Sequence, residues 1–185
     1  KCKEFALEAV EYPLPEVVVM PIKTTAKHYG RKSAKGSMFL VVEGDSGAGK
    51  EMGMQFKTKK RAWIKNVSFA IVENDSMLTR MPFRLNLYKK QGNEYTNNLV
   101  SSLQFLYTKE VIVEGRFTFN LPTSIVIEKG EYIIAVEFLE NFPNHNFHMR
   151  TGIMTGHTYY RYAPQSSWKK IPLGSTLAIE VEEEK

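Results

Sequence analysis

Large apolar residues recur at every second position along much of this chain. In three segments, 66–71, 83–88 and 116–121, apolar side chains alternate with polar ones. Successive side chains of a β-strand point to opposite faces, so this alternation predicts strands with one buried and one solvated face. A fourth segment, 132–139, has apolar residues at both kinds of position, and we predict that it is a central strand buried on both sides.

Further strands are predicted where short apolar or aromatic segments are bounded by turn-forming residues. These segments are 38–42, 52–57, 99–107, 125–128, 147–151, 158–162 and 177–182. Turns are predicted at 44–49 and 172–174, where glycine and proline gather. Strands at such short intervals, with no convincing amphipathic helix, predict an all-β fold. We expect an antiparallel β-sandwich, with a jelly roll as the preferred topology.

The first 35 residues have a different character. Residues 17–20 form an apolar run between prolines, which predicts one short edge strand. Residues 23–35 are basic and poor in large apolar side chains, as expected of a linker. We therefore interpret 1–22 as the end of a preceding module, 23–35 as a linker, and 36–185 as the main β-sandwich domain.

Composition and charge exclude several classes of protein. The chain has 185 residues, of which 43% are hydrophobic and 24% charged, as in ordinary folded domains. Its one cysteine excludes an intrachain disulfide or a multi-cysteine metal cluster, and no apolar run is long enough for a membrane-spanning helix. The net charge of +5 does not indicate nucleic-acid binding, because the densest basic run, 57–61, is better explained as a solvated turn.

One motif suggests a nucleotide-binding loop, but its context argues against this. Residues 44–50 read Gly-Asp-Ser-Gly-Ala-Gly-Lys and match the first seven positions of a P-loop. The loop then needs Ser or Thr and a helix, whereas Glu51 comes next and 52–56 alternate like a strand. We therefore expect a strand connector and no nucleotide.

Candidates for catalysis or metal binding are few. His145 and His148 could supply two metal ligands, but no further ligands accompany them, so a polar loop pair is preferred. Glu137 lies in the predicted central strand, where an unpaired carboxylate would be costly. We expect it to face solvent or to pair with a residue such as Arg84 on a neighbouring strand. No catalytic residue, metal or cofactor is assigned.

Aromatic residues gather near the C-terminal end of the chain. Tyr160 and Tyr162 share one face of the predicted strand, and Tyr159 and Arg161 share the other, so one pair is expected in the core. Rings that remain outside could stack on the apolar faces of sugars, although packing in the core or on an ordinary surface is the preferred alternative. The candidate ligand-binding residues are Tyr159, Arg161, Trp168 and Trp63.

Several segments also carry a resemblance to a family. They include Gly-Ala-Gly-Lys-Glu-Met-Gly at 47–53, Pro-Phe-Arg-Leu-Asn-Leu-Tyr-Lys at 82–89 and Gly-Glu-Tyr-Ile-Ile-Ala-Val-Glu-Phe at 130–138. In their order they resemble the C-terminal region of carboxypeptidase-like regulatory-domain-containing proteins of Gram-negative bacteria. The resemblance implies that 1–22 ends a carboxypeptidase-regulatory-like module and that a β-sandwich follows. It also implies a location in the cell envelope, periplasmic or outer-membrane-associated, and supplies no catalytic residue.

Three functional hypotheses follow. The preferred one is a non-catalytic β-sandwich module of a bacterial cell-envelope protein that binds glycan or another envelope component. The second is a purely structural or protein–protein interaction domain that supports a missing N-terminal module. The third is a carbohydrate-active enzyme, which would require two carboxylates facing each other across a cleft.

Overall fold

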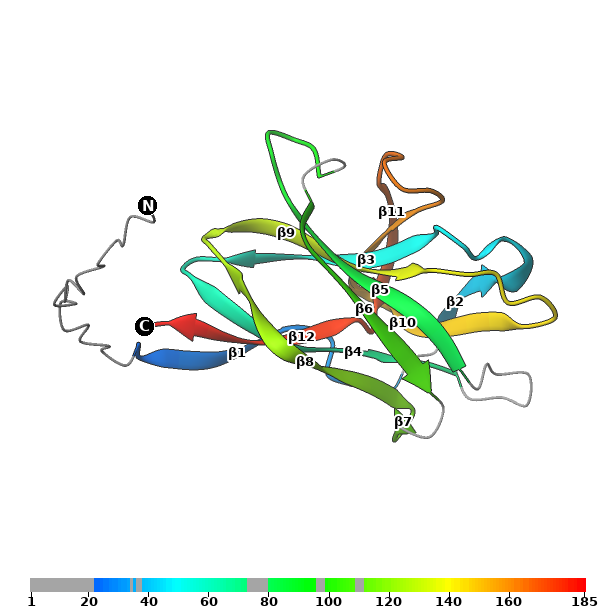
Figure 1. Ribbon diagram of the computed structural model, residues 1–185, viewed down its shortest axis with the longest axis horizontal. Helices are drawn as coiled ribbons and strands as arrows, with labels where there is room; N and C mark the ends of the chain where they lie inside the picture. Colours follow the sequence, from blue (N-terminus) through cyan, green and yellow to red (C-terminus); the bar gives the residue numbers. More distant parts are fainter. Residues whose placement is uncertain (1–21, 34, 36–37, 73–79, 96–98, 109–111) are drawn as a thin grey trace, which may run out of the picture.

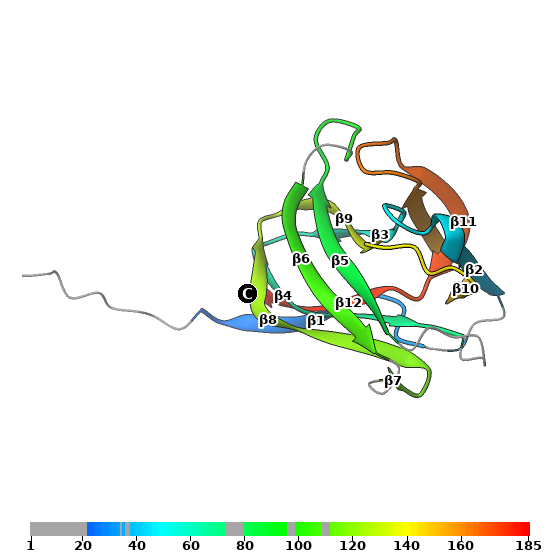
Figure 2. The same cartoon turned by 45° about the vertical axis from the view of Figure 1, so that its right-hand side comes forward.

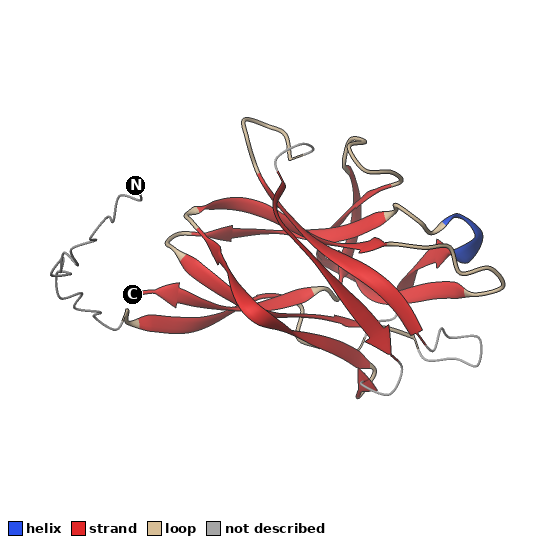
Figure 3. Cartoon of the chain, viewed as in Figure 1, coloured by secondary structure: helices blue, strands red, loops and turns tan. Residues whose placement is uncertain are grey.

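The computed structural model describes residues 22–33, 35, 38–72, 80–95, 99–108 and 112–185. These residues form strands and one short 3-10 helix, as Figure 3 shows. The elements are β1 (Thr24–Gly30), β2 (Met38–Glu43), η1 (Gly44–Ser46), β3 (Glu51–Thr58), β4 (Ala62–Ala70), β5 (Arg80–Lys89), β6 (Leu99–Thr108), β7 (Ile112–Val113), β8 (Arg116–Ile127), β9 (Gly130–Phe138), β10 (Asn146–Arg161), β11 (Lys169–Ser175) and β12 (Ala178–Glu184). Within this described part of the chain, no helix is long and apolar enough to cross a membrane.

The strands form two antiparallel sheets that pack face to face (Figure 1 and Figure 2). Sheet 1 has the order β1-β12-β4-β8-β7, and sheet 2 has the order β11-β10-β3-β9-β5-β6, with β2 also paired to β10. The eight strands of a jelly roll are conventionally lettered B to I in chain order. Sheet 1 contains B-I-D-G and sheet 2 contains C-H-E-F when these letters are given to β1, β3, β4, β5, β6, β8, β9 and β12. This is the strand order of a jelly roll, so the predicted fold class is confirmed.

Aromatic side chains fill much of the space between the sheets. The ring of Phe83 in β5 is fully buried, with its centroid 5.0–6.0 Å from those of five other rings. These rings belong to Phe69, Phe105, Tyr107, Phe138 and Phe147. Strand β9 pairs with β3 on one side and β5 on the other and is buried on both faces over most of its length. It is the central strand predicted at 132–139.

The interpretation of 23–35 as a linker is wrong, because this range contains β1. The strand pairs with β12 along its whole length, and Tyr29 packs against the core. Lys27 forms an ion pair with Glu183, a buried residue of β12 that also accepts a hydrogen bond from the Thr58 hydroxyl. Lys27, one of the basic residues that suggested a linker, therefore compensates the buried carboxylate of Glu183. The strand predicted at 17–20 lies outside the described residues, as does the proposed module remnant at 1–22 except for Ile22.

Two predicted boundaries also differ from the structure. The segments 147–151 and 158–162 belong to one strand, β10, whose pairing with β11 is interrupted between Ile153 and Thr158. The turn predicted at 172–174 lies inside β11 instead. Strand β11 ends the order of sheet 2, and an edge strand tolerates a proline such as Pro172 because one of its sides makes no ladder hydrogen bonds.

The pH dependence of stability tests how Glu183 anchors β1. The hydrogen bond from Lys27 is the main reason why the pKa of Glu183 lies below its ordinary value of 4.5. The ionised carboxylate therefore stabilises the folded state above that value, and this contribution is lost as the pH falls. We expect Glu183→Gln to lower the free energy of unfolding more at pH 7 than at pH 3, measured by urea unfolding. Equal losses at both pH values would contradict this role.

Candidate functional site

Four charged side chains form a row across the outer face of sheet 2, the face turned away from sheet 1. The strand register places Arg161 of β10 opposite Glu51 of β3, and Glu51 opposite Glu137 of β9. Arg84 of β5 lies opposite Glu137 and completes the row. Directly opposite residues of paired strands share a face, so each glutamate has an arginine on one side and the other glutamate on the other side. We call these four residues the charged row.

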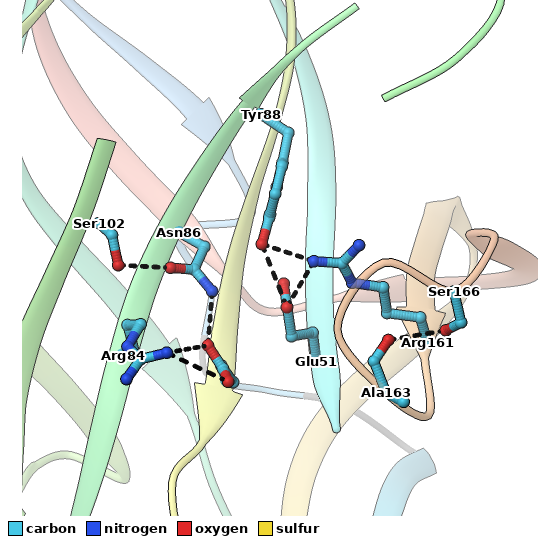
Figure 4. Close-up of polar contacts among 9 residues, drawn as sticks. Glu51, Arg84, Asn86, Tyr88, Ser102, Arg161, Ala163 and Ser166 are labelled. Carbon is cyan, nitrogen blue, oxygen red and sulfur yellow. Dashed lines mark hydrogen bonds and ion pairs between the residues drawn. The ribbon is translucent and has the colours of Figure 1, made fainter. Parts of the chain in front are cut away.

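The pair of Glu51 and Arg161 is almost completely buried. Their side chains are 1% and 2% exposed, and Arg161 Nη2 lies 2.6 Å from Glu51 Oε1 (Figure 4). The Tyr88 hydroxyl donates to the same oxygen at 3.1 Å. Burial raises the pKa of Glu51, while the hydrogen bond and charge of Arg161 act in the opposite direction. The second carboxylate oxygen, Glu51 Oε2, is buried and accepts no hydrogen bond from any described residue.

The pair of Glu137 and Arg84 is more open. Arg84 Nη1 lies 3.3 Å from Glu137 Oε2, and the Arg84 side chain is 35% exposed. Asn86 donates to the same carboxylate oxygen at 2.7 Å and accepts a hydrogen bond from the Ser102 hydroxyl at 2.8 Å (Figure 4). Of the two environments expected for Glu137, solvent or a partner such as Arg84, the structure shows the second.

A small aromatic cluster covers one end of the charged row. Tyr159 and Trp168 are partly buried against a second apolar cluster that contains Tyr88 and Tyr95 and is separate from the main core. The Arg161 guanidinium carbon lies 4.7 Å from the Tyr88 ring centroid and 4.6 Å from that of Trp168. Burial raises the pKa of Tyr95 to about 12. The cluster therefore shields Arg161 from water and strengthens its interaction with Glu51.

A polar pocket with a volume of about 400 Å³ lies over the charged row. All four charged-row residues contribute to its lining, together with Asn86 and Ser102. Pro164 and Gln165 line the pocket from the turn that follows β10, and the Ser166 hydroxyl closes this turn by donating to the Ala163 carbonyl oxygen at 2.7 Å (Figure 4). The pocket thus presents guanidinium and amide donors beside carboxylate acceptors. A ligand with many hydroxyl groups, which both donate and accept, matches this lining.

The structure brings together three of the four predicted site residues. Tyr159, Arg161 and Trp168 meet on the outer face of sheet 2. Trp63 lies in β4 of sheet 1, where the Arg61 guanidinium carbon is 5.4 Å from its ring centroid. Its assignment to the same site is therefore wrong. Tyr160 packs against the core, as expected for one of the two alternating pairs.

Sequence reasoning missed Glu51 as a site residue. In the sequence, Glu51 stands out only as the residue at the position where a P-loop needs Ser or Thr. The strand that begins there confirms that 44–50 is a strand connector. Alternation within β3 places Glu51, Gly53 and Gln55 on one face, which could have indicated an outward-facing carboxylate. In the described part of the chain, no three His, Cys, Asp or Glu side chains form a group that could hold a metal ion.

The buried ion pair can be tested with a double-mutant cycle. Replacing Arg161 leaves a buried carboxylate uncompensated, so we expect Arg161→Met to reduce the free energy of unfolding by about 3–5 kcal/mol. Combining it with Glu51→Gln should cost less than the sum of the single substitutions. Lys65→Met, which removes the exposed Lys65–Glu182 pair of sheet 1, should change stability by less than about 1 kcal/mol in urea unfolding. Additive effects of the Glu51 and Arg161 substitutions would show that the two residues are not coupled.

Comparison with known proteins adds no family assignment. No protein-family model matches this chain, and no curated protein sequence matches it significantly. The resemblance to carboxypeptidase-like regulatory-domain-containing proteins therefore rests on the sequence segments alone and stays a prediction.

Proposed function

We propose that this protein is a non-catalytic β-sandwich module that binds glycan in the polar pocket over the charged row. The observation that carries the proposal is Glu51 Oε2, a buried carboxylate oxygen that has no hydrogen-bond donor among the described residues and belongs to a residue lining the pocket. Leaving a buried acceptor unsatisfied is costly. A rotation of the buried Glu51 carboxylate toward the pocket would let a ligand hydroxyl donate to this oxygen and remove that cost, and this supports binding of a polyhydroxylated ligand.

The remaining lining supports the same class of ligand. Arg84 is partly exposed and can donate to sugar oxygens, while Glu137 and Asn86 already hold each other in a fixed geometry. Such mutual hydrogen bonding orients the polar groups before the ligand arrives, which lowers the entropic cost of binding. The two carboxylates and the two guanidinium groups of the lining cancel in formal charge, so no net positive charge attracts a phosphate group, and the lining favours a neutral ligand over a nucleotide.

We favour binding over glycoside hydrolysis because of how the two glutamates are held. They lie side by side on adjacent strands of one sheet, whereas glycosidase carboxylates flank the scissile bond. Each glutamate is also engaged by an arginine. A location in the cell envelope, periplasmic or outer-membrane-associated, is part of the proposal and rests on the family resemblance alone.

A domain that binds another protein is the second candidate. The observation that favours it is the exposure of apolar side chains on β2, where Met38, Phe39 and Val41 are all solvent-exposed. Strand β2 pairs with β10, and no other described strand pairs with it. Apolar edge strands of this kind are frequent sites of protein association.

A glycan array followed by calorimetric titration tests the proposed function. We expect wild-type protein to bind at least one neutral glycan, and we expect Arg84→Gln and Glu137→Gln each to weaken binding about 10-fold or more, since each removes a hydrogen bond to a charged group. Trp63→Ala on sheet 1 is the matched control and should leave the affinity unchanged. Thermal unfolding of each variant confirms that it is folded.

Two results would contradict the proposal. The first is binding of a glycan with equal affinity by wild type and both charged-row variants, which would place the site elsewhere. The second is the absence of binding to any glycan on the array, after which the protein-interaction hypothesis takes precedence.

A further inference from the structure

A second pocket lies where β10 changes its partner in sheet 2. Strand β10 pairs with β2 through Asn146–Thr151 and with β3 through Tyr159–Arg161. The seam between β2 and β3 leaves a cavity of about 260 Å³, lined by residues of β2, β10 and β11 and by residues 50–52 at the start of β3. This pocket is separate from the polar pocket, although Glu51 and Arg161 contribute to both linings.

The wall of this seam pocket is mostly apolar and continuous with the core. Val42 and Met52 are buried members of the main core cluster, and Leu40 and Tyr160 pack against that cluster. Ile171 completes the apolar lining from β11. A concave apolar surface that is partly open and not filled favours a ligand that can replace water with apolar contacts.

Positive charge gathers at Tyr162, which lines the seam pocket and is 58% exposed. Lys50 Nζ lies 5.9 Å from the Tyr162 ring centroid, and Lys169 Nζ lies 5.0 Å from it. The Lys50 ammonium donates to the Ser46 hydroxyl at 2.8 Å. Among the described residues, neither lysine forms an ion pair with a carboxylate, whereas the charges of Glu51 and Arg161 compensate each other.

We propose that the seam pocket binds an anionic amphiphile, namely a single alkyl chain that ends in a carboxylate. The chain lies against Met52, Tyr160 and Ile171, where it completes the packing of the wall. The carboxylate lies beside Tyr162, where Lys50 and Lys169 provide the opposite charge. This site is independent of the glycan proposal, because its ligand class and its determining residues are different.

Isothermal titration calorimetry with decanoate, 1-decanol and acetate separates the two parts of the proposal. We expect decanoate to bind with one site per chain and more tightly than 1-decanol, and we expect acetate not to bind measurably. The double variant Lys50→Gln/Lys169→Gln should weaken decanoate binding about 3- to 10-fold, as expected for two partly exposed ion pairs, and leave the affinity for 1-decanol unchanged. Decanoate is used below the concentration at which it forms micelles.

A variant that fills the pocket tests the location. We expect Ile171→Trp to abolish binding of decanoate and 1-decanol, because the indole would occupy the space of the alkyl chain. The matched control is Ile153→Trp, which changes an exposed isoleucine of β10 outside the pocket and should bind decanoate like wild type. Thermal unfolding shows that both variants are folded, and the lysine variant tests the proposal even if Ile171→Trp does not fold.

Three outcomes would overturn the inference. They are the absence of decanoate binding, affinity of wild type for decanoate no higher than for 1-decanol, and undiminished decanoate binding by either folded variant, Ile171→Trp or Lys50→Gln/Lys169→Gln. None of these outcomes affects the glycan proposal, whose test uses Arg84 and Glu137 instead.

Discussion

The need to compensate two buried carboxylates shapes the outer face of sheet 2. Glu51 and Glu137 lie side by side on β3 and β9, where their charges repel each other in a region with little water. Each is stabilised by an arginine on its far side, Arg161 for Glu51 and Arg84 for Glu137. Removing either arginine would leave a buried negative charge without a cationic partner, which is far costlier than losing a surface ion pair.

The carboxylates of Glu51 and Glu137 are compensated to different extents, and this difference is the basis of the proposed binding site. Glu137 is engaged by Arg84 and Asn86, and Ser102 in turn holds Asn86. Glu51 uses one oxygen for both Arg161 and Tyr88 and leaves Oε2 without a donor among the described residues. A protein tolerates such an unsatisfied acceptor where water or a ligand supplies the missing hydrogen bond. Glu51 lines the polar pocket, so the residue with the unsatisfied oxygen belongs to the proposed binding site.

The sequence predicted the architecture well because a strand with one buried face leaves a clear pattern. Alternation around Phe83 and Phe117 marked their strands, and apolar residues at every position marked β9 as central. The sequence narrowed the environment of Glu137 to solvent or a partner such as Arg84, because an unpaired carboxylate on a buried strand is costly, but alternation alone could not decide between the two. Strand β1 was missed, since its stability comes from pairing with β12 and from Lys27, and neither contact leaves an alternating apolar pattern.

The candidate site was predicted only in part. Local alternation correctly placed Tyr159 and Arg161 on one face, but it cannot show which distant strands lie beside them. Glu51 is 110 residues from Arg161, and only the strand register brings the two together. The same limitation explains Trp63, whose aromatic character suggested a shared site although β4 belongs to the other sheet.

The most direct test of the central claim is the ionisation of Glu51, followed by the carboxyl carbon-13 signal during a pH titration. If burial beside Tyr88 and Arg161 desolvates Glu51, its pKa lies above the ordinary glutamate value of 4.5. A pKa at or below that value would mean that water reaches the carboxylate freely or that Arg161 compensates it fully. Either finding would contradict a pocket built on an incompletely satisfied buried charge.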